Sequence, residues 1–292
     1  MSFQDALARC ATETDALLDR LLPIDAFPAP RVTEAMRYSA LGQGKRLRPF
    51  LVVESAALFG VPRDRALRTG AALDCVHCYS LVHDDLPAMD DDDLRRGKPT
   101  AHKAFDEATA ILAGDALLTY AFEILADEAT HPDAAIRISL VSKLAKAAGV
   151  AGMVGGQMLD IEAETQNAAE LAHIGLIQSL KTGALFRYAC EAGAVLGQAD
   201  PAPLIRYAQK IGLAFQIADD ILDVESTPEA LGKATQKDKA MGKATFVDLL
   251  GMDEAKRRAA ELVDEAVESL AGYGNKARVL NEAARFIVER RK

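Results

Sequence analysis

The sequence has no tryptophan, and aromatic residues of all kinds make up only 5% of its 292 residues. Aromatic residues are enriched in strands, whereas alanine and leucine, which are abundant here, favour helices. No stretch shows the alternation of a strand, and no short repeat is present. Half of the residues are hydrophobic, which is enough for a sizeable core. The composition therefore predicts an all-α protein.

Cysteine is also scarce. The four cysteines are too few for a disulfide framework and are typical of a reducing cytosol. Cys75 and Cys78 form a CxxC motif, but it lies in an apolar run with no βαβ pattern around it. We interpret this pair as part of a helix core, with a redox or zinc site as the alternative.

The chain has no excess of positive charge and no uninterrupted apolar run. Its net charge of −9 argues against a basic surface for nucleic acid. The N-terminus has no basic-then-apolar signal pattern, and Asp115 and Glu123 interrupt the most apolar stretch, residues 108–126. We therefore predict a cytoplasmic protein that binds no nucleic acid and does not insert stably into membranes.

What the sequence does contain is two dense clusters of aspartate, six between residues 84 and 93 and three between residues 219 and 223. Their members are Asp84, Asp85, Asp90, Asp91, Asp92 and Asp93, followed by Asp219, Asp220 and Asp223. Removing water from so many like charges is costly, so the clusters lie either on a solvated surface or around metal cations. Short acids with no metal-binding histidine beside them favour Mg²⁺ over zinc.

The first cluster follows a long helix that we predict over residues 64–85. His77, Ser80 and Asp84 share one face of this helix, which places the histidine on the side of the acids. An ordinary core or surface histidine is the alternative. Pro87 ends or bends the helix, so Asp90 could return to the same ligand as Asp84.

Basic residues precede another predicted helix. A glycine-containing turn at residues 42–44 places Lys45, Arg46 and Arg48 just before a helix N-terminus. Backbone N–H groups, the helix dipole and fixed cations can together bind a phosphate there. An ordinary solvated basic turn is the alternative.

The second cluster lies on a helix predicted over residues 201–224. Its polar stripe contains only short acids and one amide, whereas a solvated face normally mixes lysine, glutamate and arginine. The stripe consists of Gln216, Asp219, Asp220 and Asp223. In the helix predicted before it, over residues 168–190, Lys181 and Thr182 lie mid-helix, and a buried lysine needs an anionic partner.

Two Mg²⁺-binding clusters brought face to face could clamp one diphosphate, with Arg95, Lys181 and Lys233 adding positive charge. A second, metal-free anion site would then consist of Lys45, Arg48, His77 and Arg96. Two such sites with apolar helix walls between them imply that two lipidic diphosphates react. The metal would make diphosphate a good leaving group, and the apolar walls would keep water from the resulting cation.

These residues resemble the trans-isoprenyl diphosphate synthase family over nearly the whole chain. DDLPAMD (84–90) and DDILD (219–223) look like its two aspartate-rich motifs. Six further motifs match in order: GKRLRP (44–49), LRRGKPT (94–100), GDAL (114–117), GGQMLD (155–160), KTGALF (181–186) and FQIADD (215–220). In the first motif four residues separate the paired acids from the last one, and this spacing resembles that of bacterial farnesyl diphosphate synthases and related geranylgeranyl enzymes.

The resemblance implies a single all-α domain over residues 1–292, a bundle of ten or more helices around a central cavity, and a homodimer. It implies three Mg²⁺ ions per active site, with Mn²⁺ as the alternative metal. Asp84 and Asp90, helped by Asp85, would bind two of them. Asp219 would bind the third, with Asp223 a weaker candidate.

The resemblance also implies which residues bind substrate. Arg95, Lys181 and Lys233 would hold the allylic diphosphate, and Lys45, Arg48, His77 and Arg96 would hold isopentenyl diphosphate. The resemblance implies catalytic roles for Lys181, Thr182 and Gln216. Thr182 and Gln216 would line the place where the allylic cation forms. The reaction would be ionisation, attack by the isopentenyl double bond and proton loss to the released diphosphate.

Product length depends on the floor of the pocket. Tyr79 and Ser80 lie one turn before Asp84, and an aromatic side chain there would stop a growing chain early. We therefore expect farnesyl diphosphate (C15), made from dimethylallyl or geranyl diphosphate. Geranylgeranyl (C20) and geranyl (C10) products are the alternatives, with Tyr79 as a plain core residue. Rival functions are a class I terpene cyclase, a non-catalytic prenyltransferase subunit and a generic acidic metal-binding protein.

Overall fold

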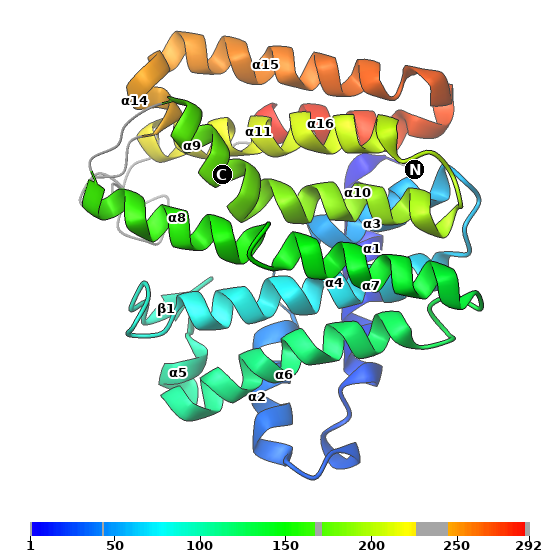
Figure 1. Ribbon diagram of the computed structural model, residues 1–292, viewed down its shortest axis with the longest axis vertical. Helices are drawn as coiled ribbons and strands as arrows, with labels where there is room; N and C mark the ends of the chain where they lie inside the picture. The colour runs from blue at the N-terminus through cyan, green and yellow to red at the C-terminus, as the bar shows by residue number, and fades with distance from the viewer. Residues whose placement is uncertain (1, 43, 167–170, 226–244, 290–292) are drawn as a thin grey trace. The chain divides into compact units, whose positions relative to one another are not determined.

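The computed structural model describes residues 2–42, 44–166, 171–225 and 245–289, and helices dominate them (Figure 1). Within these ranges the only strands are β1 (Leu94–Arg95) and β2 (Lys98–Pro99), which pair antiparallel. The predicted all-α class is confirmed.

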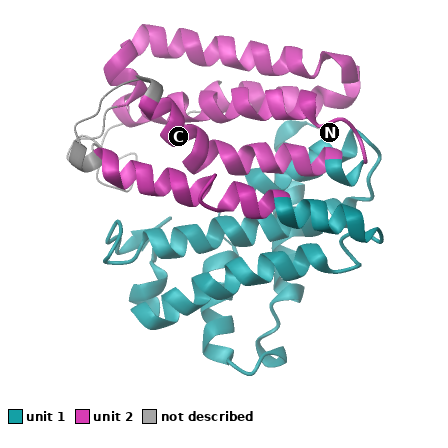
Figure 2. Ribbon diagram, viewed as in Figure 1, with its two compact units in different colours: residues 1–142, 195–197 teal, residues 143–194, 198–292 magenta. Residues whose placement is uncertain are grey.

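The chain forms two compact units (Figure 2). Unit 1 contains residues 1–142 and 195–197, and unit 2 contains residues 143–194 and 198–292. The first division falls within helix α7 (Ala134–Ala148). One domain around a central cavity stays a prediction.

Unit 1 is built around helix α4 (Arg63–Asp84), which packs against α1, α2, α3 and α6. Apolar and small residues occur on most sides of α4, as expected for a helix surrounded by others. At Gly70, an added Cβ would lie 3.0 Å from Cα of Pro49, so the glycine permits α3 to approach. The elements around α4 are α1 (Phe3–Leu21), η1 (Ile24–Ala26), α2 (Pro30–Ala40), α3 (Leu47–Ala57), α5 (Ala101–Ala104) and α6 (Glu107–Ala126).

Unit 2 is built around helix α11 (Ala202–Glu225), which packs against α15, α16, η2 and α14. Its other elements are α8 (Met153–Gln166), α9 (Leu171–Gln178), η2 (Ser179–Gly183), α10 (Ala184–Leu196), α14 (Phe246–Leu250), α15 (Met252–Ser269), η3 (Ala271–Ala277) and α16 (Arg278–Glu289). The helix predicted over residues 168–190 is not one regular α-helix, because η2 is a turn of π-helix between α9 and α10.

A glycine-rich stretch separates α7 from α8. A Cβ added at Gly152 would lie 2.1 Å from the carbonyl oxygen of Ala147, and one at Gly155 would lie 2.0 Å from that of Val150. Only glycine fits these positions without a shift of the backbone, so the stretch breaks the helix and lets the chain turn tightly.

Two stretches are long and apolar enough to cross a membrane, Glu107–Ala126 and Ala134–Ala163. This is weak evidence for a span, because core helices of soluble proteins pass the same test. The first stretch is α6, which packs against α4 and α2 within unit 1.

Candidate active site

The first aspartate cluster begins where α4 ends. The backbone N–H of Asp90 donates to the carbonyl oxygen of Asp84 at 2.9 Å, so the intervening residues form a closed loop. Asp91 closes it with a second bond, from its N–H to the Leu86 carbonyl at 3.1 Å, and has a positive φ of 48°. The backbone of Asp90 thus comes back to the backbone of Asp84, as expected.

Asp85 is buried and is held by Arg95. The Nε of Arg95 donates to Oδ1 of Asp85 at 2.7 Å, and its Nη2 lies 2.5 Å from the same oxygen. Arg95 reaches back to the acid because Arg96 and Gly97 form the turn of the β1–β2 hairpin, both with positive φ. Burial acts to lower the pKa of Arg95, but the hydrogen bond to Asp85 and the charges of Asp85, Asp92 and Asp84 together outweigh burial and raise the pKa.

The remaining acids of this cluster differ in their surroundings. Asp93 is exposed and forms an ion pair with Lys103 at 2.9 Å, and Asp92 lies 3.7 Å from Arg95. The backbone of Asp93 also accepts a hydrogen bond from the N–H of Thr100 at 3.0 Å. Asp93, just before the hairpin, is therefore bound to the start of helix α5 through Thr100 and Lys103.

Three of the four residues predicted for the metal-free anion site lie close together in unit 1. Burial lowers the pKa of His77 well below its usual value, and the charges of Arg48 and Arg96 lower it further. The histidine is therefore neutral near pH 7. Burial also lowers the pKa of Arg48 to about 10, although Asp74 opposes this. The fourth residue, Lys45, is exposed and lies three positions before Arg48.

The glycine turn predicted before α3 brings Arg96 to this group. Gly44 has a φ of +80°, and a Cβ added to it would lie 2.3 Å from Nη1 of Arg96. The guanidinium of Arg96 therefore lies directly against Gly44, and the positive φ of Gly44 favours glycine at this position. Helix α3 begins at Leu47, so Arg48 lies within its first turn and not before it as predicted.

Arg46 is a residue of this site whose role was not predicted. It is 5% exposed, has a φ of 52°, and caps α3 while its guanidinium is buried. It forms ion pairs with Asp15 and Asp74, the latter on α4. No pattern in the sequence separates Arg46 from its basic neighbours, because its inward direction goes with contacts to Asp15 and Asp74, which are distant in the sequence.

In unit 2, Lys181 lies on the π-helical turn η2, a kind of turn that often occurs at functional sites. Its Nζ donates to Oδ2 of Asp160 on α8 at 2.6 Å. Gly156, one turn before Asp160, makes this possible, because a Cβ there would lie 2.2 Å from the backbone nitrogen of Lys181. Asp160 was not predicted as a site residue, although the GGQMLD motif contains it.

Helix α11 carries the second aspartate cluster, and η2 packs against it. A Cβ added at Gly212 would lie 3.6 Å from Cα of Gly183, which follows Thr182. Gln216 and Asp219 are half-buried on α11, and Asp223 is exposed. The predicted Lys181, Thr182 and Gln216 thus come from two packed elements of one unit.

Asp220 differs from its neighbour Asp219. Its Oδ2 accepts a hydrogen bond at 2.7 Å from the backbone N–H of Phe246, the first residue of α14. This bond satisfies an N–H group at the start of a helix and anchors α14 to α11. Lys233, also predicted to bind substrate, lies outside the described residues.

The predicted chain-length residues lie on α4. Tyr79 is 7% exposed, and burial and the charge of Asp84 both raise its pKa. Ser80 is half-buried, and its hydroxyl donates to the carbonyl oxygen of His77 at 2.9 Å. Tyr79 is therefore a buried aromatic residue just over one turn before Asp84.

The described part of the chain contains no group of three or more His, Cys, Asp or Glu side chains that could hold a metal ion. Mg²⁺ usually takes one or two carboxylates and completes its coordination with water and substrate phosphates. The donors of both clusters are short carboxylates, and Asp84 and Asp90 are joined through their backbones. The residues present therefore suit Mg²⁺.

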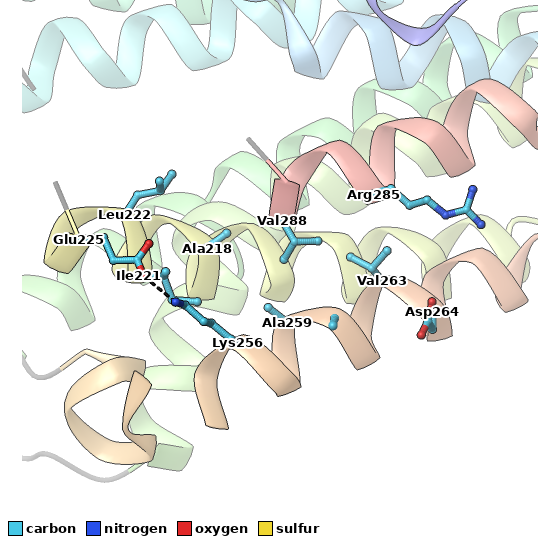
Figure 3. A pocket seen from close by; sticks show the side chains of 11 residues that line it. Ala218, Ile221, Leu222, Glu225, Lys256, Ala259, Val263, Asp264, Arg285 and Val288 are labelled. Atoms are coloured by element: carbon cyan, nitrogen blue, oxygen red, sulfur yellow. Dashed lines mark hydrogen bonds and ion pairs between the residues drawn. The ribbon is translucent and has the colours of Figure 1, made fainter. Parts of the chain in front are cut away.

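A cavity of about 790 Å³ lies elsewhere in unit 2, between α11, α15 and α16 (Figure 3). Its walls include Ala218, Ile221 and Val263, and an ion pair between Lys256 and Glu225 at 2.6 Å closes one side. Among the described residues, no predicted site residue lines this cavity.

An all-helical fold with an acid-rich end of α4 and an acid stripe on α11 is typical of a prenyltransferase of the isoprenoid synthase class, and the comparisons with known proteins show this class. The chain belongs to the polyprenyl synthetase family, since the family model with the description "Polyprenyl synthetase" matches residues 29–283. The resemblance to trans-isoprenyl diphosphate synthases is thereby confirmed.

Individual relatives agree with this assignment. The chain is 45% identical to the farnesyl diphosphate synthase of Escherichia coli over an alignment of length 301 that covers all of both proteins. It is 44% identical to the geranylgeranyl diphosphate synthase of Cyanophora paradoxa, covering 89% of this chain and 87% of that protein. The crystal structure of an FPP/GFPP synthase from Zymomonas mobilis matches with a TM-score of 0.90 and 48% identity, covering 98% of each chain.

Proposed function

We propose that this prenyltransferase condenses dimethylallyl and geranyl diphosphate head to tail with isopentenyl diphosphate, with farnesyl diphosphate as its main product. The observation that carries the proposal is the grouping of Arg48, His77 and Arg96 in the unit whose α4 ends in Asp84. An anion site without metal ligands beside an acid-rich helix end is what a two-diphosphate reaction requires.

The residues of each unit have distinct roles in this proposal. Asp84 and Asp90, with Asp85 as a helper, and Asp219 of unit 2 would hold Mg²⁺. Bound Mg²⁺ would supply the positive charge that makes diphosphate a good leaving group. Lys181 binds the allylic diphosphate, and Asp160, at 2.6 Å from its ammonium, orients it.

On the other substrate, Lys45, Arg48 and Arg96 donate hydrogen bonds to the diphosphate of isopentenyl diphosphate. His77 is neutral, so it donates one N–H without adding charge to an already cationic site. Thr182 and Gln216 border the developing allylic cation, and the released diphosphate accepts the proton. Arg95 and Lys233 are proposed to add charge around the allylic diphosphate.

The proposed C15 product is supported by the buried ring of Tyr79 and by the relatives named farnesyl diphosphate synthase. A geranylgeranyl product is the second candidate, because relatives with that name are about as similar. We further propose a cytoplasmic homodimer with three Mg²⁺ ions per site. Exposed apolar residues of unit 1, Ile111, Leu112 and Ile138, suit an interface with a second copy.

One assay tests the proposed function. Labelled isopentenyl diphosphate is incubated with dimethylallyl diphosphate and Mg²⁺, and the products are extracted and sized. We expect Mg²⁺-dependent formation of C15. The absence of extension would refute the proposal and favour a non-catalytic subunit, whereas cyclised hydrocarbon from one allylic substrate would indicate a terpene cyclase. Light scattering of the protein as it elutes from a size-exclusion column measures its molar mass and so tests the proposed homodimer.

A further inference from the structure

Arg46 is a buried cation that the proposed mechanism does not use. Its side chain is 2% exposed, and the Nε donates to Oδ1 of Asp15 at 2.9 Å. One terminal nitrogen of its guanidinium pairs with Asp74, and the other contacts Asp15 and the carbonyl oxygen of Ala40. No room is left around this guanidinium for a substrate phosphate.

These contacts join four helices at one point. Asp15 lies on α1, Ala40 is the last residue of α2, Arg46 caps α3 and Asp74 lies within α4. Because Arg46 is fixed on all sides, the direction of the chain on either side of it is fixed as well. That chain contains Gly44, against which Arg96 lies, and Arg48 in the first turn of α3.

Asp74 is a buried acid next to the residues of the metal-free anion site. It is 2% exposed, and His77 follows it by three positions on the same face of α4. The charges of Arg46, Arg48 and Arg96 all act on this carboxylate and oppose the rise in its pKa that burial causes. Asp74 is therefore close enough to offset the mutual repulsion of three guanidiniums.

We propose that Asp74 and Arg46 are positioning residues for the metal-free anion site. The ion pair with Asp74 holds Arg46 in place, and Arg46 in turn fixes the turn from Gly44 to Arg48. The buried negative charge of Asp74 also offsets the repulsion between Arg48 and Arg96, so that both can occupy the site before the substrate binds. Neither residue touches the substrate. The inference rests on the proposed function, because it assumes that this site receives isopentenyl diphosphate.

The central variant is Asp74→Asn, which keeps the shape of the side chain and removes its charge. We expect the KM for isopentenyl diphosphate to rise about tenfold or more, with the KM for the allylic substrate within about twofold of wild type. Asp74→Glu should restore part of the loss. The matched control is Glu191→Gln, which removes another buried acid, paired with Lys143 in unit 2, and should change neither KM.

A purely structural role predicts a different pattern. Asp74→Asn would then lower the melting temperature and leave both KM values unchanged, or raise both equally, and either result would overturn the inference. If Asp74→Asn does not fold, Arg46→Lys takes its place, because lysine keeps the charge but cannot make the forked contacts of arginine. It is judged by the same selective rise in KM.

A binding measurement separates this inference from the proposed function. Inorganic diphosphate is titrated calorimetrically into the protein in EDTA, where only a metal-free site can bind it. We expect wild type and Glu191→Gln to bind it and Asp74→Asn to bind about tenfold more weakly. If the assay shows no condensation but this difference is found, the proposed function fails, while the positioning of a metal-free anion site by Asp74 is still supported. If wild type and Asp74→Asn bind equally, or wild type does not bind, the inference fails even where condensation occurs.

Discussion

The imidazole of His83 meets the ring of Tyr79 edge to face, with the centroids 5.7 Å apart and the planes at 79°. Gly114 on α6 makes room for it, because a Cβ there would lie 2.1 Å from Nε2 of His83. The same nitrogen lies 3.1 Å from the carbonyl oxygen of Ile111. Tyr79 is therefore supported by a second ring that α6 holds in place, and this support suits the proposed role of Tyr79 as the floor of the product pocket.

The first prediction concerns this floor. Tyr79→Ala removes the ring, so the growing chain gains space, and we expect the main product to become longer than C15. Tyr79→Phe keeps the ring and should leave the product length as it is. Products are sized by chromatography after incubation with excess isopentenyl diphosphate. An identical product distribution for wild type and Tyr79→Ala would show that chain length is set elsewhere.

The second prediction concerns the proposed metal ligands. Asp84→Ala and Asp219→Ala should each reduce Mg²⁺-dependent turnover by more than about a hundredfold, because each removes an oxygen donor for which water is a poor replacement. Asp92→Ala is the control from the same cluster and should have a much smaller effect. Turnover is measured over a range of Mg²⁺ concentrations, with thermal unfolding checked by circular dichroism. Equal losses for all three variants would contradict the assignment.

The third prediction concerns the approach of α8 to η2. Gly156→Ala places a Cβ against the backbone of Lys181, so the helices must separate, and we expect a loss of roughly 1–3 kcal/mol in the free energy of unfolding. Activity should fall as well, since Lys181 moves away from Asp160.

Gly175→Ala on α9 is the control. Its Cβ meets nothing within 4 Å, so it should be neutral or stabilise by up to about 1 kcal/mol. Denaturant titration measures both variants, and a stable Gly156→Ala would refute the close approach.

The fourth prediction concerns the cysteines. Burial raises the pKa of the Cys10 thiol from 9.0 to about 12, and that of Cys78 also to about 12. At pH 8 their thiolate fractions are therefore roughly a thousandfold below those of an exposed thiol. We expect iodoacetamide to label the two residues in urea and not in the native protein, as followed by peptide mass spectrometry. Rapid native labelling of Cys78 would revive the redox or metal-site alternative for the CxxC pair.

The same shifts give a direction for stability at high pH. The folded state holds these thiols protonated to a higher pH than the unfolded state does. Their contribution to stability is therefore complete below about pH 9 and is lost as the pH rises toward about 12. Cys10→Ala should flatten the decline of the unfolding free energy in this window.

Long helices with clear ends were the most predictable part of the fold. The predicted helix over residues 64–85 is α4, Arg63–Asp84, and the one over residues 201–224 is α11, Ala202–Glu225. Proline and glycine fix such ends locally, so the sequence contains the information. The π-helical turn around Lys181 could not be predicted, because it depends on the packing of α8 through Gly156.

Side-chain direction was the least predictable part of the site. Lys45, Arg46 and Arg48 form one basic stretch, yet Arg46 points into the core while Lys45 is exposed. The difference comes from tertiary contacts with Asp15 and Asp74, which are 31 and 28 positions away. Asp160 was missed for the same reason, since its partner Lys181 lies on another helix.

The left-handed backbone at Arg46 belongs to a wider pattern. Within the part of the chain that the structure describes, four residues other than glycine have positive φ, and three of them, Arg46, Asp91 and Arg96, lie in the turns that build the candidate site. Each such residue costs the folded state roughly 1–2 kcal/mol. Backbone strain in this protein is thus concentrated where substrate is proposed to bind. Substitution of these three residues by glycine would relieve the strain and raise the stability of the protein. It would also remove the side chains that position or bind the diphosphate, so the gain in stability would be accompanied by a loss of function.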